Sequence, residues 1–149
     1  MAIKQSAYFK GNARTPVPHP HRKGETLTFI FTHTFTEAMA DTDVLELFPI
    51  FPYGRIVSFE FTTANIGTPA LDIGLMSGDA GSLDAARTSD DVLIDGVAAN
   101  ASTGTKTALA DIAAIAMNGE TAVSVGVKTA TTIAAASNKT LTVLITVVS

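Results

Sequence analysis

The feature that most constrains the fold is a period-two alternation of apolar residues within residues 55–81, RIVSFEFTTANIGTPALDIGLMSGDAG. Such alternation is typical of a β-strand that has one dry face and one wet face. Residues 65–69 (NIGTP) interrupt the pattern with the asparagine, glycine and proline of a turn. The stretch therefore predicts a central antiparallel hairpin. Its inward side chains are Val57, Phe59 and Phe61, then Leu71, Ile73 and Leu75.

Further strand patterns follow along the chain. They cover residues 26–36, 44–48, 90–96, 121–129 and 140–148. Pro49 and Pro52 are expected to stop the second of these strands, and an Asp-Gly turn to end the third. Residues 107–117 fit a short helix ending at Asn118-Gly119, or an alanine-rich strand that turns there. Many short strands with turn signals between them predict an all-β fold, an antiparallel β-sandwich or jelly roll, over residues 26–149.

Residues 1–25 have a different character and predict an extended N-terminal arm. Prolines at positions 16, 18 and 20 exclude helix and favour polyproline II. At about 3.1 Å per residue, a free arm of this length could reach roughly 75–80 Å. The arm carries five basic residues and one acid, whereas the remaining chain carries five basic residues and thirteen acids. It could dock on the acidic face of a neighbouring copy, or it could be a disordered tail.

Composition limits the classes of partner. Charged residues make up 16% of the chain and hydrophobic residues 46%, whereas an ordinary domain has about 25% charged residues. Part of the surface is therefore expected to be an interface; a neutral, threonine-rich monomer is the alternative. The spread of basic residues does not predict nucleic-acid binding. No signal-peptide core precedes the domain, and residues 141–148 are too short to span a bilayer. We expect a soluble protein with no membrane partner.

Residues capable of catalysis or metal binding are few. His19 and His21 could chelate a metal, but no third ligand lies nearby in the sequence. His33 falls on the phenylalanine-rich face of its strand, which favours a core residue. The chain has no cysteine and no nucleophile motif, so we expect no enzyme activity, no cofactor and no metal. Five aspartates lack EF-hand spacing and are typical of turns: Asp79, Asp84, Asp90, Asp91 and Asp95.

Three features together resemble the small decoration, or cement, proteins of tailed-bacteriophage capsids. They are the proline-containing N-terminal segment, the run RIVSFEFTTANIGTPALDIGLMSGDAG followed by DVLIDG, and the C-terminal segment TAVSVGVKTATTIAAASNKTLTVLITVVS. The resemblance covers most of residues 26–149 and brings no invariant motif. It implies a jelly-roll-like domain, most often a homotrimer, that binds the major capsid protein and bridges adjacent capsomers. The protein would be made in the host cytoplasm and lie on the virion exterior.

The resemblance also leads to a hypothesis for the contact residues. The arm would lie along a capsid neighbour, and the loop at residues 77–82 could be a second contact edge. A receptor- or carbohydrate-binding module of a phage tail or fibre is the alternative, although the chain has no tryptophan and two tyrosines with which to stack on a sugar. The residues expected to make the arm contact are Tyr8, Phe9, Arg14, Pro16, Pro18, Arg22 and Lys23.

Overall fold

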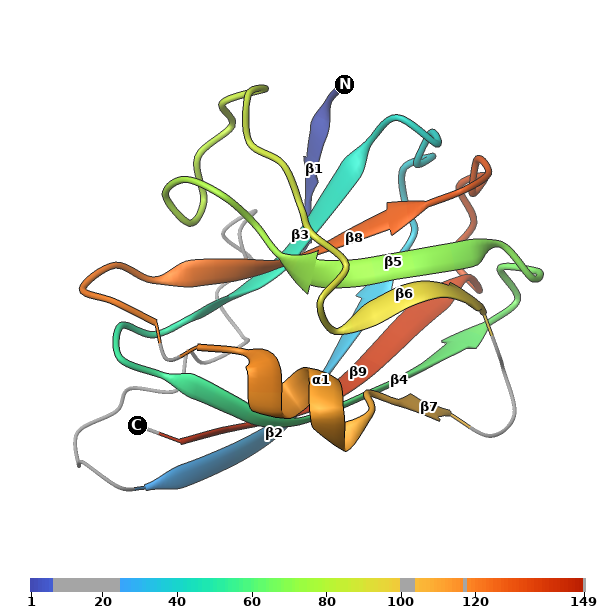
Figure 1. Cartoon of the computed structure of the whole chain (residues 1–149). Helices are drawn as coiled ribbons and strands as arrows, with labels where there is room; N and C mark the ends of the chain where they lie inside the picture. The colour runs from blue at the N-terminus through green and yellow to red at the C-terminus, as the bar shows by residue number, and fades with distance from the viewer. Residues whose placement is uncertain (7–24, 100–103, 117, 149) are drawn as a thin grey trace.

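Two β-sheets face each other in the computed structural model, which describes residues 1–6, 25–99, 104–116 and 118–148 (Figure 1). The predicted all-β antiparallel sandwich is confirmed. The five-stranded sheet has the order β1 (Ile3–Gln5), β3 (Val44–Ile50), β8 (Val123–Thr129), β5 (Ala70–Leu75), β6 (Ile94–Ala98). The four-stranded sheet has the order β2 (Thr26–Thr34), β9 (Thr140–Val148), β4 (Arg55–Ala64), β7 (Thr105–Lys106).

The pairing pattern is that of one long double strand folded over on itself. β2 pairs with β9, β3 with β8, β4 with β7 and β5 with β6, all antiparallel. The fold then brings β9 beside β4 and β8 beside β5. This winding is consistent with the jelly roll that the sequence predicts.

The core lies between the sheets and follows the predicted alternation. In β9 the inward residues Leu141, Val143, Ile145 and Val147 are almost fully buried, and their neighbours in sequence are half-buried. In β2 the threonines and Ile30 face solvent, while Phe31 is buried on the opposite face. Each buried side chain of this kind contributes about 1.5–3 kcal/mol relative to an exposed one.

The predicted central hairpin is wrong. β4 and β5 form as expected, but they belong to different sheets and pair with β9 and β8 instead. Alternation determines which side chains face inward, and leaves the neighbouring strand undetermined. At the start of β4, the side chains that face the core also differ from the predicted ones. A bulge between Ile56 and Ser58 buries Ile56 and turns Val57 outward.

Three boundaries differ from the expectation. β3 continues through Pro49, which pairs with Ser124 of β8. On the other side of β3, β1 pairs with residues 44–46 alone, so the strand is an edge at Pro49. A proline is tolerated at such an edge or next to a bulge. Asp95-Gly96 does not end a strand but lies inside β6. Residues Leu109–Ala114 form α1 with Ile112 buried, which selects the helical alternative, but the helix ends at Ala114 rather than at Asn118-Gly119. None of the described helices is long and apolar enough to cross a membrane.

The first residues belong to the sandwich rather than to an arm. Ile3, Lys4 and Gln5 pair in parallel with Val44, Leu45 and Glu46. Residues 7–24, which include every proline of the predicted arm, lie outside the described residues. The arm thus leaves one sheet after Ser6 and enters the other at Thr26. The reach calculated for twenty-five free residues does not apply to a segment held at both ends.

Candidate interaction surfaces

The predicted contact residues of the arm cannot be placed on the fold. All seven, Tyr8 to Lys23, lie outside the described residues, as do His19 and His21. The point where the arm leaves the domain is well defined. The backbone N–H of Ser6 donates to the carbonyl of Glu46 at 2.8 Å, and the Ser6 hydroxyl donates to the carbonyl of Leu47. Ser6 is fully buried, so the root of the arm is part of the core.

A buried ion pair lies beside this root. Arg87 Nη2 is 2.8 Å from Glu46 Oε1, and the two side chains are 3% and 0% exposed. The Ser124 hydroxyl and the backbone N–H of Gly81 also donate to Glu46 Oε1. Gln5 Nε2 donates to Glu46 Oε2 at 3.3 Å. One carboxylate therefore joins β1, β3, β8 and the loop after β5.

Arg87 holds that loop in shape from within. Its Nε donates to the carbonyl of Ser77 at 2.8 Å, and its Nη1 donates to the carbonyl of Ser82 at 2.6 Å. A guanidinium can satisfy several acceptors at fixed angles, which suits it to this position. The loop at residues 77–89 is thereby tied to the same carboxylate as Gln5.

The charge of Glu46 is stabilised despite its burial. Burial alone would raise the pKa of Glu46, because it disfavours the ionised form. The donors from Arg87, Gly81, Ser124 and Gln5 outweigh this effect, so the pKa of Glu46 lies below its ordinary value. The group is ionised at neutral pH and compensates the charge of Arg87.

This network was missed in the sequence, although a signal was present. Glu46 is a single carboxylate within the apolar run Val-Leu-Glu-Leu-Phe of residues 44–48. Arg87 is the one basic residue between Arg55 and Lys106. A lone charge in a buried strand needs a partner of opposite charge, and Arg87 was the available candidate.

The outer surface of the 77–95 segment is acidic. Leu83 lies among these acids and is 66% exposed. Asp84 and Asp90 accept turn hydrogen bonds from the N–H groups of Ala86 and Val92, and Asp90 also accepts one from Leu75 of β5. Among the described residues no group of three potential ligands is arranged to hold a metal ion. The exposed aspartates of this segment are the five that the sequence singled out: Asp79, Asp84, Asp90, Asp91 and Asp95.

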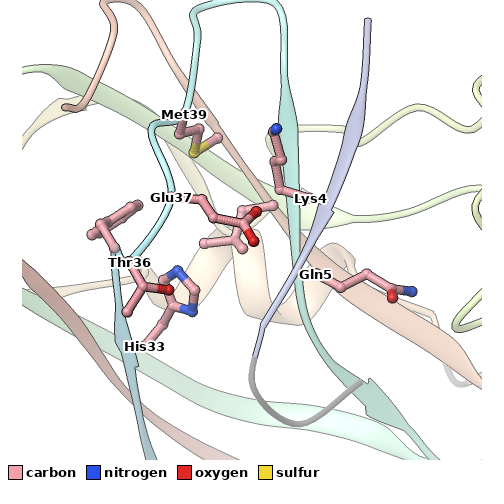
Figure 2. Close-up of a pocket in the computed structure, with 8 residues that line it drawn as sticks. Lys4, Gln5, His33, Thr36, Glu37 and Met39 are labelled. Atoms are coloured by element: carbon pink, nitrogen blue, oxygen red, sulfur yellow. The ribbon is translucent and has the colours of Figure 1, made fainter. Parts of the chain in front are cut away.

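His33 lies at a small pocket between the root of β1 and the end of β2 (Figure 2). Its ring packs edge-on against Phe35, with centroids 4.9 Å apart. Lys4, Glu37 and Met39 line the other side, and the space holds about one water molecule. His33 is half-buried, so it lies at the margin of the core rather than within it as expected, and it contacts the core through Phe35.

Three exposed apolar side chains lie on β4 or on segments next to it in the fold. Gly54 N–H donates to the carbonyl of Phe51, which closes a turn with Tyr53 at a φ of 60°. Hydrogen bonds from Thr107 to Phe59 and from Asn118 to Gly54 align the segment containing α1 along β4. The three exposed side chains are Tyr53, Val57 and Leu109, at 54%, 38% and 81% exposure.

Comparison with known proteins gives no match to a family model and none to a curated protein. Among solved structures, the chain is similar to a chain of the capsid of Ralstonia phage GP4. The identity is 28% and the TM-score 0.81, over 99% of this chain and 97% of that one. A second likeness, to a chain of the cyanophage Pam1 capsid asymmetric unit, has 16% identity and a TM-score of 0.55, over 91% and 93%. That second likeness concerns the fold alone. The likeness to a capsid chain of phage GP4 supports a phage capsid-related structural protein.

Proposed function

We propose that the chain is a decoration protein that cements the outside of a phage capsid by bridging adjacent capsomers. The observation that carries this proposal is the likeness to a GP4 capsid chain along nearly the whole of both chains. The two chains therefore have about the same length, and the likeness is not to one domain of a larger protein. The GP4 match comes from a capsid rather than from a tail, which favours decoration over a receptor- or glycan-binding tail module.

The role is structural and not enzymatic. A bridging protein adds contacts that are lost only when the capsid lattice opens. Because many copies act together, small free energies at the individual contacts combine to stabilise the whole capsid. The partners are the major capsid protein and other copies of this chain, with a trimer as the proposed oligomer. The protein is made in the host cytoplasm and resides on the virion exterior.

The arm is the proposed contact with the capsid. Its apolar anchors are Tyr8 and Phe9, and Arg14, Arg22 and Lys23 face acidic groups of the neighbour, with Pro16 and Pro18 keeping the chain extended. Residues 6 and 25 belong to the described fold, so the arm is tethered to the domain at both ends. Eighteen residues that go out and return can reach at most about 30 Å. The neighbour it binds must therefore adjoin the domain directly.

The first test mixes purified protein with undecorated phage heads and images them by electron cryomicroscopy. We expect ordered density on the outer surface between capsomers. Smooth heads at saturating protein, or a specific glycan-array signal without head binding, would contradict the proposal and favour the tail-module alternative.

A charge-matched pair of variants then tests the arm. One variant replaces Arg14, Arg22 and Lys23 with serine, and the control replaces Lys106, Lys128 and Lys139 with serine. Both lose three positive charges, and the body lysines make at most weak surface ion pairs. We expect the arm variant to bind heads at least tenfold more weakly and the control to bind nearly as the parent does. Equal binding by the two variants would rule out the arm as a specific contact.

A further inference from the structure

β2 is a long edge strand with one side open in the described structure. It is the outermost strand of the four-stranded sheet, and β9 is the strand that pairs with it among the described residues (Figure 1). The pairing with β9 runs in one register from Thr26 to Thr34 without a bulge. An edge of this kind presents a row of backbone N–H and C=O groups to any strand that approaches.

The groups on the open side can be identified. Phe35 N–H donates to the carbonyl of Lys139, which makes this position a hydrogen-bonded pair with the β9 side. Hydrogen-bonded pairs alternate along an antiparallel ladder. The odd-numbered residues of β2 therefore bond toward β9, and the backbone groups of Thr28, Ile30 and Thr32 point to the open edge.

The protections that an edge strand can carry in its own residues are missing from β2. Natural edges are blocked by a charged side chain, a proline, a bulge or a very short strand. β2 has nine residues, TLTFIFTHT, with no Asp, Glu, Lys, Arg or Pro and a continuous register. Ile30, at the middle of the strand, is 67% exposed.

The sequence of β2 is nearly symmetric about Ile30. Thr28 and Thr32 are equidistant from it, as are Phe29 and Phe31, and Thr26 and Thr34. A twofold contact needs a surface that is complementary to itself. We propose that β2 pairs antiparallel with β2 of a second copy, with Ile30 opposite Ile30 and Thr28 opposite Thr32. Two four-stranded sheets would then form one continuous sheet of eight strands.

The proposed contact repeats a pairing that the molecule already uses. Thr28 and Thr32 pair with Thr146 and Thr142 of β9, with hydroxyl oxygens 2.8 and 3.0 Å apart. Opposite threonines across the new seam would extend these rows, and cross-strand pairs of this kind are favourable. The contact does not depend on the proposed function. It also leaves the other strands free for a trimer, in which case the twofold contact would link trimers.

The sharpest test uses the absence of cysteine from the chain. In the proposed register Ile30 faces its own counterpart in a hydrogen-bonded pair, where Cα atoms are about 5.5 Å apart, within disulfide range. Ile30→Cys in the full chain should form a crosslinked dimer under mild oxidation. Val57→Cys, an exposed position on β4 of the same sheet, is the control and should stay monomeric in the crosslinking assay.

A mixing experiment tests the register. Thr28→Cys and Thr32→Cys should each crosslink poorly alone and efficiently when mixed. Hydrogen exchange followed by NMR tests the pairing itself. The amides of Thr28, Ile30 and Thr32 should exchange at least about tenfold more slowly at high protein concentration than at low concentration. Ile30→Lys should abolish this difference, whereas Ile30→Thr should retain it.

Three results would overturn the proposal. The first is rapid exchange of these amides at every concentration, with no crosslink through position 30. The second is protection that is independent of concentration, which would mean that residues of the same chain cover the edge. The third is a dimer whose crosslinks do not follow the Ile30 symmetry. Thermal unfolding of each variant checks that it is folded. All the substituted positions are exposed, so we expect every variant to fold.

Discussion

Glu46 and Arg87 form a buried ion pair, so removing one of the two charges should lower the free energy of unfolding strongly. Breaking a buried ion pair by removing one partner typically costs about 3–5 kcal/mol, because the remaining charge is buried without compensation. Glu46→Gln should therefore lower the free energy of unfolding by about this amount, measured by denaturant unfolding. Lys106→Met, which breaks an exposed pair 3.7 Å long, is the control and should cost less than about 1 kcal/mol.

A double variant separates charge from packing. Glu46→Met combined with Arg87→Met removes both charges, and such replacements are often close to neutral. We expect it to be more stable than Glu46→Gln. If the double variant is the less stable of the two, the pair stabilises the fold by more than mutual compensation.

The low pKa of Glu46 predicts how stability depends on pH. Because the pKa is lower in the folded than in the unfolded state, the contribution is complete above the ordinary glutamate pKa of about 4.3. As the pH falls below about 5, the unfolded chain takes up the proton first, and stability decreases until the folded group is protonated too. Chemical denaturation between pH 6 and pH 3 should show a shallower decline in Glu46→Gln. An identical decline in both proteins would show that Glu46 does not contribute.

Tyr53 occupies a position that favours glycine. A non-glycine residue at a φ of 60° costs about 1–2 kcal/mol, and glycine would relieve it at an entropic cost of up to about 1 kcal/mol. We expect Tyr53→Gly to raise the free energy of unfolding by up to about 1 kcal/mol and Tyr53→Ala to give no gain.

If the exposed ring of Tyr53 contacts a neighbour, both variants should bind heads more weakly. Unchanged binding by both would assign the ring no role in assembly.

At the scale of elements, β1 changes how the N-terminal segment is to be tested. Removing residues 2–24 would delete the arm, but it would also delete β1 and the Gln5 bond to Glu46. Removing residues 2–5 alone should lower stability by about 2–3 kcal/mol, since net values near 1 kcal/mol apply to each lost hydrogen bond. Replacing residues 7–24 with a Gly/Ser chain of equal length should leave the melting temperature nearly unchanged. An equal loss of stability in the two variants would contradict this, because residues 7–24 would then stabilise the fold as much as residues 2–5 do.

The wrong prediction of a hairpin between β4 and β5 shows that an alternating pattern does not specify which strands pair. Residues 55–64 and 70–75 were correctly predicted as strands, but their five-residue connection crosses from one sheet to the other. A two-residue turn would have specified local pairing; a longer connection is compatible with either arrangement. The bulge at Val57 was equally hidden, because the pattern in sequence is continuous there.

At the scale of the whole molecule, the proposed function predicts a mechanical effect. Heads saturated with the protein should release DNA at a higher temperature than undecorated heads, because many bridging contacts must break together. Fluorescence of a DNA dye during heating measures this release. Decoration by Ile30→Lys should give a smaller shift if twofold contacts link copies on the head, with Ile30→Thr as its control. Equal release temperatures with and without bound protein would contradict a cementing role.

Local patterns in the chain were enough to specify the class of the fold and most of its inward side chains. Alternation in residues 26–34 and 140–148 predicts two half-buried strands from local geometry alone, and both are observed. The choice of neighbouring strands, and the place of residues 3–5 in a sheet, became visible in the folded molecule alone. The folded molecule also shows that Glu46 meets Arg87, forty-one positions away. Side-chain orientation repeats every two residues along the chain, whereas strand partnership and burial of a charge depend on contacts between distant segments that no local pattern records.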